Sequence, residues 1–214
     1  MSDEVTQVLA IRHGETDWNV ELRVQGQLDI GLNETGRRQA RHLAAAFAGE
    51  ALHAVYSSDL ARAHATALCV ADAAGLAVQT HQGLRERGFG RFEGLTFDEI
   101  ESRHPEDARR WRQRDPDFAP AGGEALRTFQ ARAVATIAAI AERHRGQRVA
   151  IVTHGGVLDA LYRAAARIAL DAPRTWQLGN AAINRVLHGA HGFTLVGWSD
   201  TQHLLGGMRE EGSA

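Results

Sequence analysis

Two histidines with similar surroundings are the residues best placed to do chemistry. His13 and His154 are each followed directly by glycine. Each comes just after a short apolar run, residues 8–11 and 149–152, of the kind that forms a strand buried on both faces. In open α/β sheets, ligands bind beyond the carboxyl ends of the strands. If the two strands are neighbours, both imidazoles meet at one site, where glycine lets a ligand approach the backbone closely.

Two arginines are expected at the same end of the sheet. Arg12 precedes His13 directly, and Arg62 falls in the first turn of a helix that follows another predicted strand. Two guanidinium groups beside two imidazoles indicate a dianion such as phosphate. A histidine that attacks phosphorus must be neutral, and neighbouring cations lower its pKa. The helix that begins after Gly155-Gly156 would offer free N–H groups to the same anion.

A carboxyl group completes the set of reactive side chains. Transfer of a phosphoryl group needs a proton for the leaving oxygen, and Glu86 is the best candidate donor. It lies in a glycine-rich segment, residues 83–96, that reads as a loop able to enter a cleft. Glu93 and Glu15 are competing candidates.

The elements that must position these residues alternate between strand and helix. We expect an α/β fold, a three-layer α/β/α sandwich with a mostly parallel sheet. Asn33 is a predicted helix N-cap, and the last two strands are expected to form a hairpin. Residues 97–121 carry three of the four prolines and predict one or two surface helices packed over the sheet edge. Strands are expected at 8–11, 54–56, 77–79, 149–152, 182–187 and 193–198, and helices at 33–48, 60–74, 124–144 and 157–166.

Length and composition narrow the function classes. The 214 residues suit a single domain, expected at 1–205, with a disordered tail at 206–214. The net charge of -2 gives no sign of a nucleic-acid or membrane partner. One cysteine, Cys69, excludes an intrachain disulfide and a Cys-rich zinc site. The start of the chain is polar and acidic, unlike a signal peptide, and no apolar run approaches the roughly 18 residues of a membrane helix. A cytoplasmic protein is expected, and a homodimer is the commonest assembly.

Several motifs follow one another in order along most of the chain. They are Arg12-His13-Gly14-Glu15-Thr16 with Trp18-Asn19, Gln25-Gly26, Leu32-Asn33-Glu34-Thr35-Gly36, Ser57-Ser58 through Arg62-Ala63, Leu84-Arg85-Glu86 with Gly90 and Glu93-Gly94, Gly122-Gly123-Glu124, and Thr153-His154-Gly155-Gly156. Together these motifs resemble those of the histidine phosphatases, or phosphoglycerate mutase-like superfamily. In the family the Gly-Gly-Glu motif usually continues with Ser, whereas Ala125 follows here, which removes a hydrogen bond from the start of a helix.

This resemblance implies a two-step mechanism without a metal or other cofactor. His13 would attack phosphorus to form a phosphohistidine, and Glu86 would protonate the leaving alcohol and then activate water. His154 would donate a hydrogen bond to the charge on the transferred group. The residues expected to bind the substrate, a small phosphorylated metabolite, are Arg12, Arg62, Asn19, Gln25, Gly26, Thr16 and Gly155.

The reaction catalysed within this family is a separate question. A cofactor-dependent phosphoglycerate mutase is the first alternative to a phosphatase for small phosphomonoesters. Such mutases carry the sequence Glu-Arg-His-Tyr-Gly, which begins at the catalytic Glu, and a large insertion. This chain lacks the His-Tyr pair and the large insertion. Hydrolysis is therefore favoured, unless the arginines at 109, 110, 112 and 114 form a second anion site.

Two further alternatives remain. A catalytically silent protein that binds a phosphorylated ligand is disfavoured because all five catalytic positions are filled. The His-x-Glu of His13 and Glu15 is also found in zinc deaminases, but their cysteine pair cannot be supplied by one cysteine.

Overall fold

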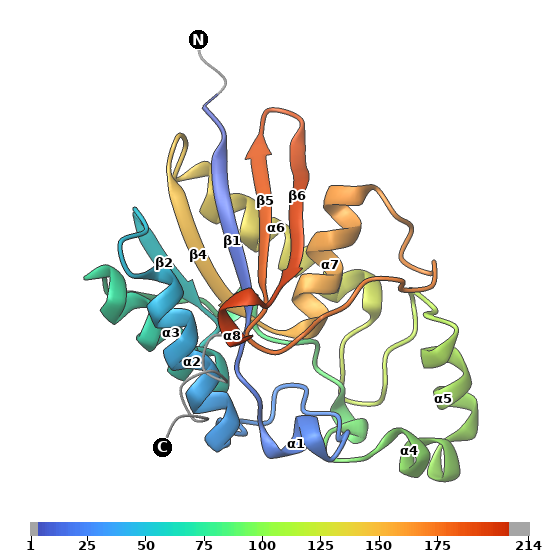
Figure 1. Cartoon of the computed structure of the whole chain (residues 1–214). Helices are drawn as coiled ribbons and strands as arrows, with labels where there is room; N and C mark the ends of the chain where they lie inside the picture. Colours follow the sequence, from blue (N-terminus) through green and yellow to red (C-terminus); the bar gives the residue numbers. More distant parts are fainter. Residues whose placement is uncertain (1–3, 206–214) are drawn as a thin grey trace.

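The computed structural model describes residues 4–205, and its six strands form one sheet in the order β3-β2-β4-β1-β5-β6 (Figure 1). The strands β3, β2, β4 and β1 run parallel, whereas β5 is antiparallel to both β1 and β6. The mostly parallel sheet and the late hairpin are thereby confirmed. The bounds are β1 (Thr6–Arg12), β2 (Ala54–Ser57), β3 (Val78–Thr80), β4 (Arg148–Thr153), β5 (Ile183–Gly189) and β6 (Gly192–Asp200).

Helices cover both faces of the sheet and make the expected three layers (Figure 1). The helices α2 (Glu34–Phe47) and α3 (Ala61–Ala74) pack with Leu9 and Ile11 of β1. The helices α6 (Leu126–Glu142) and α7 (Gly155–Ala166) pack on the other face, with Val8 and Ala10. Successive residues of β1 point to opposite faces and all four are buried, which explains the unbroken apolar run in the sequence.

Two helix starts bear directly on the site. Asn33 caps α2, because its side chain accepts a hydrogen bond from the backbone N–H of Gly36 at 2.8 Å. A Cβ at Gly36 would lie 2.0 Å from the carbonyl oxygen of Glu15, so glycine is required for α2 to pack on the loop after β1. The helix α7 begins at Gly155, immediately after His154 and two residues earlier than expected.

The second half of the glycine-rich segment and the residues that follow it form a small core of their own. It contains a 3-10 turn (Gly90–Phe92) and the helices α4 (Phe97–Arg103) and α5 (Pro105–Arg112). Figure 1 shows α4 and α5 on the side of the molecule where β1 ends. Both helices were expected to pack over the sheet edge. Instead, their apolar residues bury one another; the buried members of this cluster are Phe92, Ile100, Ala108 and Phe118.

The remaining elements are short: α1 (Asp17–Val20), a 3-10 turn at Gln82–Leu84, and α8 (Gln202–Leu205). The tail expected at 206–214 lies outside the described residues, and the assignment of 1–205 to one domain stays a prediction. Among the helices described, none is both long and apolar enough to cross a membrane.

Candidate active site

The two histidines meet where β1 and β4 end. These strands are parallel neighbours in a register that pairs Arg12 with Thr153, so His13 and His154 follow at the same level. Their ring centroids are 5.2 Å apart, and both side chains are buried. The predicted juxtaposition is therefore present in the structure.

His13 is held as a neutral imidazole with one nitrogen free to react. Its Nδ1 lies 2.7 Å from the carbonyl oxygen of Gly14. A carbonyl oxygen can only accept a hydrogen bond, so Nδ1 carries the proton and the lone pair lies on Nε2. Burial, followed by the charges of Arg12 and Arg62, holds the pKa of His13 well below its usual value of 6.5. A neutral ring with a free lone pair on Nε2 is the form that a nucleophilic histidine requires.

His154 lies beside His13 and is fully buried. Burial lowers its pKa well below 6.5, and the charge of Arg62 adds to the effect. Within residues 4–205, neither ring nitrogen has a hydrogen-bond partner. A neutral imidazole retains one N–H, so His154 can donate a single hydrogen bond to a group that enters the site.

The two arginines are anchored by backbone carbonyl groups. Arg62 donates from Nη1 to Leu28 O and from Nη2 to Gly26 O, both at 2.8 Å. Arg12 donates from Nη1 to the carbonyl oxygen of Leu178. The buried Nε of each guanidinium has no partner among the described residues. Burial lowers the pKa of Arg62 to about 10, so this group is still protonated at neutral pH.

These groups surround a cavity of about 180 Å³. Phe89 and Trp111, from the small core beside the sheet, complete its wall. His154 is fully buried and does not line the cavity, but its ring lies 5.2 Å from that of His13, which does. The lining contains eight of the residues expected from the sequence: Arg12, His13, Asn19, Gln25, Gly26, Arg62, Glu86 and Gly155.

Glu86 is the carboxylate on this wall. Its Oε2 accepts from the N–H of Gly156 and its Oε1 from the N–H of Arg87, both at 2.8 Å. The carboxylates of Glu93 and Glu15 are engaged elsewhere: Glu93 accepts from two backbone N–H groups of nearby loops, and Glu15 accepts from an asparagine amide. Neither of them lines the cavity, so the geometry favours Glu86 over its competitors.

The start of α7 takes part in the site through two glycines: Gly155 lines the cavity and Gly156 binds Glu86. Its Gly156 N–H binds the carboxylate of Glu86 and is not free for an anion. A Cβ at Gly156 would lie 2.1 Å from Glu86 Oε1, so glycine at this position makes room for the carboxylate. The hydrogen bond from the helix start therefore holds the Glu86 carboxyl group in place.

The first loop contributes both wall and support. Asn19 lines the cavity, and its Oδ1 accepts from Asn180 Nδ2 at 3.1 Å and from Thr16 N at 3.1 Å. The Thr16 side chain caps α1 and does not reach the cavity wall. Gln25 is buried on the wall, with Oε1 unpartnered within residues 4–205.

Two supporting interactions were missed by sequence reasoning. Asn180 donates to the carbonyl oxygen of His13 at 3.0 Å, and nothing in its sequence surroundings indicates this role. Arg132 pairs with both carboxylate oxygens of Glu124 at 2.9 and 2.7 Å and donates to the carbonyl oxygen of Glu86 at 3.3 Å. The motif containing Glu124 was the available signal. Together Arg132 and Glu124 brace the segment that carries Glu86.

The arginines at 109, 110, 112 and 114, on α5 and just after it, stay outside the cavity. Three members are exposed and bonded to acidic neighbours, whereas the fourth, Arg114, lines an adjoining cavity and pairs with Asp159 at 2.7 Å. The exposed pairs are Arg109 with Glu106, Arg110 with Asp115 and Arg112 with Glu101.

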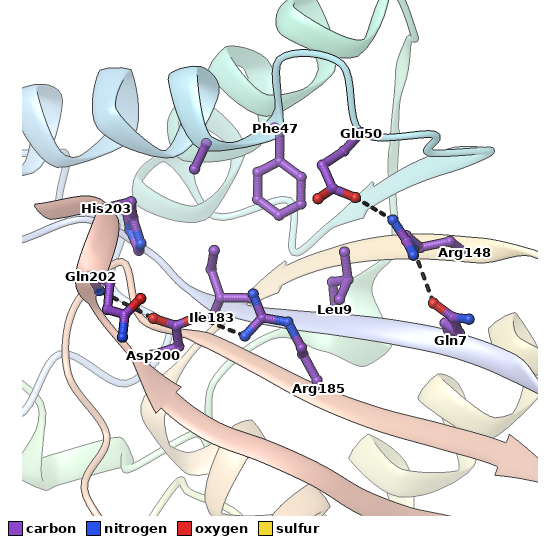
Figure 2. A pocket seen from close by; sticks show the side chains of 11 residues that line it. Gln7, Leu9, Phe47, Glu50, Arg148, Ile183, Arg185, Asp200, Gln202 and His203 are labelled. Atoms are coloured by element: carbon purple, nitrogen blue, oxygen red, sulfur yellow. Dashed lines mark hydrogen bonds and ion pairs between the residues drawn. The ribbon is translucent and has the colours of Figure 1, made fainter.

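A separate hollow of about 190 Å³ lies between α2 and the sheet, as Figure 2 shows. Its charged groups satisfy one another: Arg185 pairs with Asp200 at 2.7 Å, and Arg148 pairs with Glu50. Phe47 of α2 contributes an apolar side chain to it (Figure 2). This hollow lacks the set of reactive groups found at the other site.

The site holds its positive charge on arginines. In the part of the chain that the structure describes, no three histidine, cysteine or acidic side chains are grouped in a way that would hold a metal ion. The arrangement of two neutral imidazoles, two guanidinium groups and one carboxyl suits the transfer of a phosphoryl group to and from nitrogen.

Comparisons with known proteins agree with this arrangement. The chain is 38% identical over 207 residues to a metal-independent phosphoserine phosphatase of Arabidopsis thaliana, covering 95% of this chain and 85% of the relative. It is 36% identical over 206 residues to phosphoglycerate mutase-like protein 4 of the same plant, covering 94% and 88%. A solved structure of a mycobacterial glucosyl-3-phosphoglycerate phosphatase is 32% identical, with a TM-score of 0.82 and coverage of 91% of this chain and 99% of that one.

The family assignment rests on these likenesses and on the match of a family profile. The profile of the histidine phosphatase superfamily (branch 1) matches residues 8–201, a span that includes both strand-end histidines and Glu86. The chain belongs to the histidine phosphatase superfamily.

Proposed function

We propose that this protein is a metal-independent phosphatase that hydrolyses small phosphomonoesters through a phosphohistidine on His13. The observation that carries the proposal is the cavity that brings His13, Arg12, Arg62 and Glu86 onto one wall. The relatives named as phosphatases support hydrolysis as the reaction.

In the first step the ester phosphate lies between the two guanidinium groups. Nε2 of His13 attacks phosphorus, a P–N bond forms, and the P–O bond to the alcohol breaks. Glu86 in its protonated form gives its proton to the leaving oxygen. His154 donates its N–H to the phosphoryl oxygens, and the guanidinium groups balance the charge that develops there.

In the second step water replaces the alcohol. Glu86, now ionised, takes a proton from the water while the oxygen attacks phosphorus and the P–N bond breaks. Inorganic phosphate leaves, and His13 returns to its neutral form. The hydrogen bond from the Gly156 N–H keeps the carboxylate at the same place in both steps.

Transfer to water is favoured over transfer to a second alcohol, the mutase reaction. A mutase must hold a bisphosphate, which requires a second anion site. The candidate cations Arg109, Arg110 and Arg112 are exposed and paired with carboxylates outside the cavity. The homodimer and the cytoplasmic location remain predictions.

The test is hydrolysis of p-nitrophenyl phosphate and of a panel of phosphorylated metabolites in the presence of EDTA. We expect release of phosphate by the native chain and none by His13→Ala. Activity that survives His13→Ala contradicts the nucleophile, and activity that EDTA removes and a metal restores contradicts the metal-independent mechanism. Interconversion of 2- and 3-phosphoglycerate in the presence of 2,3-bisphosphoglycerate, without net hydrolysis, identifies a mutase instead.

A further inference from the structure

A second cavity adjoins the first on the far side of Glu86. It has a volume of about 200 Å³ and shares the wall residues Glu86, Phe89 and Trp111 with the phosphate cavity. Each volume is below the roughly 300 Å³ at which pockets for drug-sized ligands begin. The two cavities together therefore suit a small metabolite with its phosphate on one side of Glu86.

The second cavity is the place for the alcohol part of the substrate. This step rests on the function proposed above, because Glu86 protonates the leaving oxygen there. The phosphoryl group lies toward His13, so the carbon chain of the alcohol extends past Glu86 to the opposite side. The apolar side chains of Phe129 and Leu170 line this compartment and offer a surface suited to a carbon chain.

Three guanidinium groups line the second cavity, but two of them are occupied. Arg87 donates to the carbonyl oxygens of Glu124 and Phe118 at 2.9 and 2.8 Å. Arg114 pairs with the carboxylate of Asp159 and donates to the carbonyl oxygen of Leu170. Arg174 is exposed, and among residues 4–205 it has no ion pair or side-chain hydrogen bond. It is the cation in this compartment that is available to a ligand.

The segment that carries Arg174 is fixed to the body of the protein two residues later. Trp176 stacks on Tyr162 of α7, with ring centroids 4.0 Å apart, and Tyr162 in turn meets Trp198 of β6 edge-on at 4.7 Å. The indole of Trp198 donates to the carbonyl oxygen of Gln177 at 2.9 Å. Burial lowers the pKa of Arg12, and the nearby charge of Arg174 lowers it further, so Arg174 also lies near the phosphate cavity.

We infer that Arg174 determines substrate specificity by binding a carboxylate on the alcohol part of the phosphomonoester. The preferred substrates are accordingly small phosphorylated hydroxy acids or hydroxy amino acids. An arginine binds a carboxylate through two parallel N–H···O bonds, which fixes the orientation of the carbon chain as well as its charge. Neutral and cationic alcohols lack this contact and are poorer substrates.

The test compares esters that differ in the charged group. Phosphoserine and 3-phosphoglycerate carry a carboxylate, glycerol phosphate does not, and phosphoethanolamine carries an ammonium group. In Arg174→Gln we expect kcat/KM to fall about ten- to a hundredfold for the two acids, mainly through KM, and to stay within about twofold for glycerol phosphate. Arg174→Glu should in addition improve phosphoethanolamine relative to phosphoserine. Arg109→Gln, on an exposed arginine outside both cavities, is the matched control.

Binding measurements separate this inference from the proposed function. Calorimetric titration of 3-phosphoglycerate and glycerol phosphate into the His13→Ala chain, with and without Arg174→Gln, needs no turnover. The expected result is tighter binding of the acid that depends on Arg174. Equal binding of the two esters when Arg174 is intact, or equal losses for both in Arg174→Gln, overturns the inference. Absence of hydrolysis by the native chain, with discrimination in binding retained, overturns only the proposed function.

Discussion

The two buried histidines should make the stability of the protein depend on pH in a defined window. Burial and neighbouring arginines hold the folded-state pKa of His13 and His154 well below 6.5. An unfolded chain has no such burial, so each histidine there titrates near its ordinary value of about 6.5. Below that pH the unfolded state binds more protons than the folded state, and the free energy of unfolding falls as the pH falls.

The size of the effect follows from the proton balance. Between pH 7.5 and 5.5, each histidine that stays neutral in the folded state removes about 1.4 kcal/mol from the free energy of unfolding, or about 2.7 kcal/mol for the pair. The contribution of the two neutral histidines to the free energy of unfolding is fully present above the unfolded-state pKa of about 6.5. It falls as the pH falls, until the pH reaches the folded-state pKa. Other titrating groups, including the partly buried His203, contribute equally to native and variant chains and cancel in the comparison.

The assay is urea unfolding in phosphate-free buffer at pH 7.5, 6.5 and 5.5. The native chain is compared with the double variant His13→Asn, His154→Asn, and with His191→Asn at an exposed turn as the control for removing a histidine. We expect the double variant to lose about 2.7 kcal/mol less than the native chain over this range. A difference under about 0.5 kcal/mol would show that the imidazoles are already protonated, or are solvated in the folded state, and would refute the reasoning.

Three further predictions follow from the contacts described above. Glu86→Gln should lower kcat for alkyl phosphates about 10²- to 10⁴-fold, but far less for p-nitrophenyl phosphate, whose phenolate leaves without a proton; equal losses on both would exclude the acid role. Gly156→Ala should also lower kcat more for alkyl phosphates than for p-nitrophenyl phosphate, by a smaller factor, because the added Cβ would lie 2.1 Å from Glu86 Oε1 and displace the carboxylate. Its circular dichroism spectrum should show no loss of secondary structure. Ala125→Ser should raise the free energy of unfolding by about 1 kcal/mol in urea titrations, since Ala125 is the N-cap of α6 and makes no side-chain capping bond; no gain would mean that the serine hydroxyl does not reach the helix N–H groups.

Much of the fold and the site could be predicted because the signals are local. The runs at 8–11 and 149–152 are apolar at every position, and only a strand covered on both faces needs that pattern. A histidine and a glycine directly after each run are then placed by chain connectivity alone. The cap at Asn33 and the missing cap at Ala125 are likewise decided within four residues of sequence.

What could not be predicted depends on contacts between distant segments. Arg12 is anchored by a carbonyl group 166 residues away, and every residue supplies such a group, so no residue type marks the contact. The predicted packing of α4 and α5 over the sheet edge was wrong for a related reason. Their apolar residues are equally suited to cover a sheet or one another. They cover one another because Phe92 and Phe118, far apart in sequence, join the same buried cluster. The choice among three glutamates also required the folded positions of Gly156, which binds Glu86, and of Gln27 and Phe89, whose backbone N–H groups bind Glu93.

The division of the site by Glu86 has a consequence for how such a protein can change. The groups proposed to hold phosphate come from β1, α3 and the loop around Gly26, whereas Arg174, Phe129 and Leu170, proposed to face the alcohol, come from other segments. Substitutions in the second set alter the shape and charge offered to the alcohol without moving the nucleophile. Selection, or a designer, can therefore exchange one metabolite for another by altering a few side chains while the reaction itself is inherited intact.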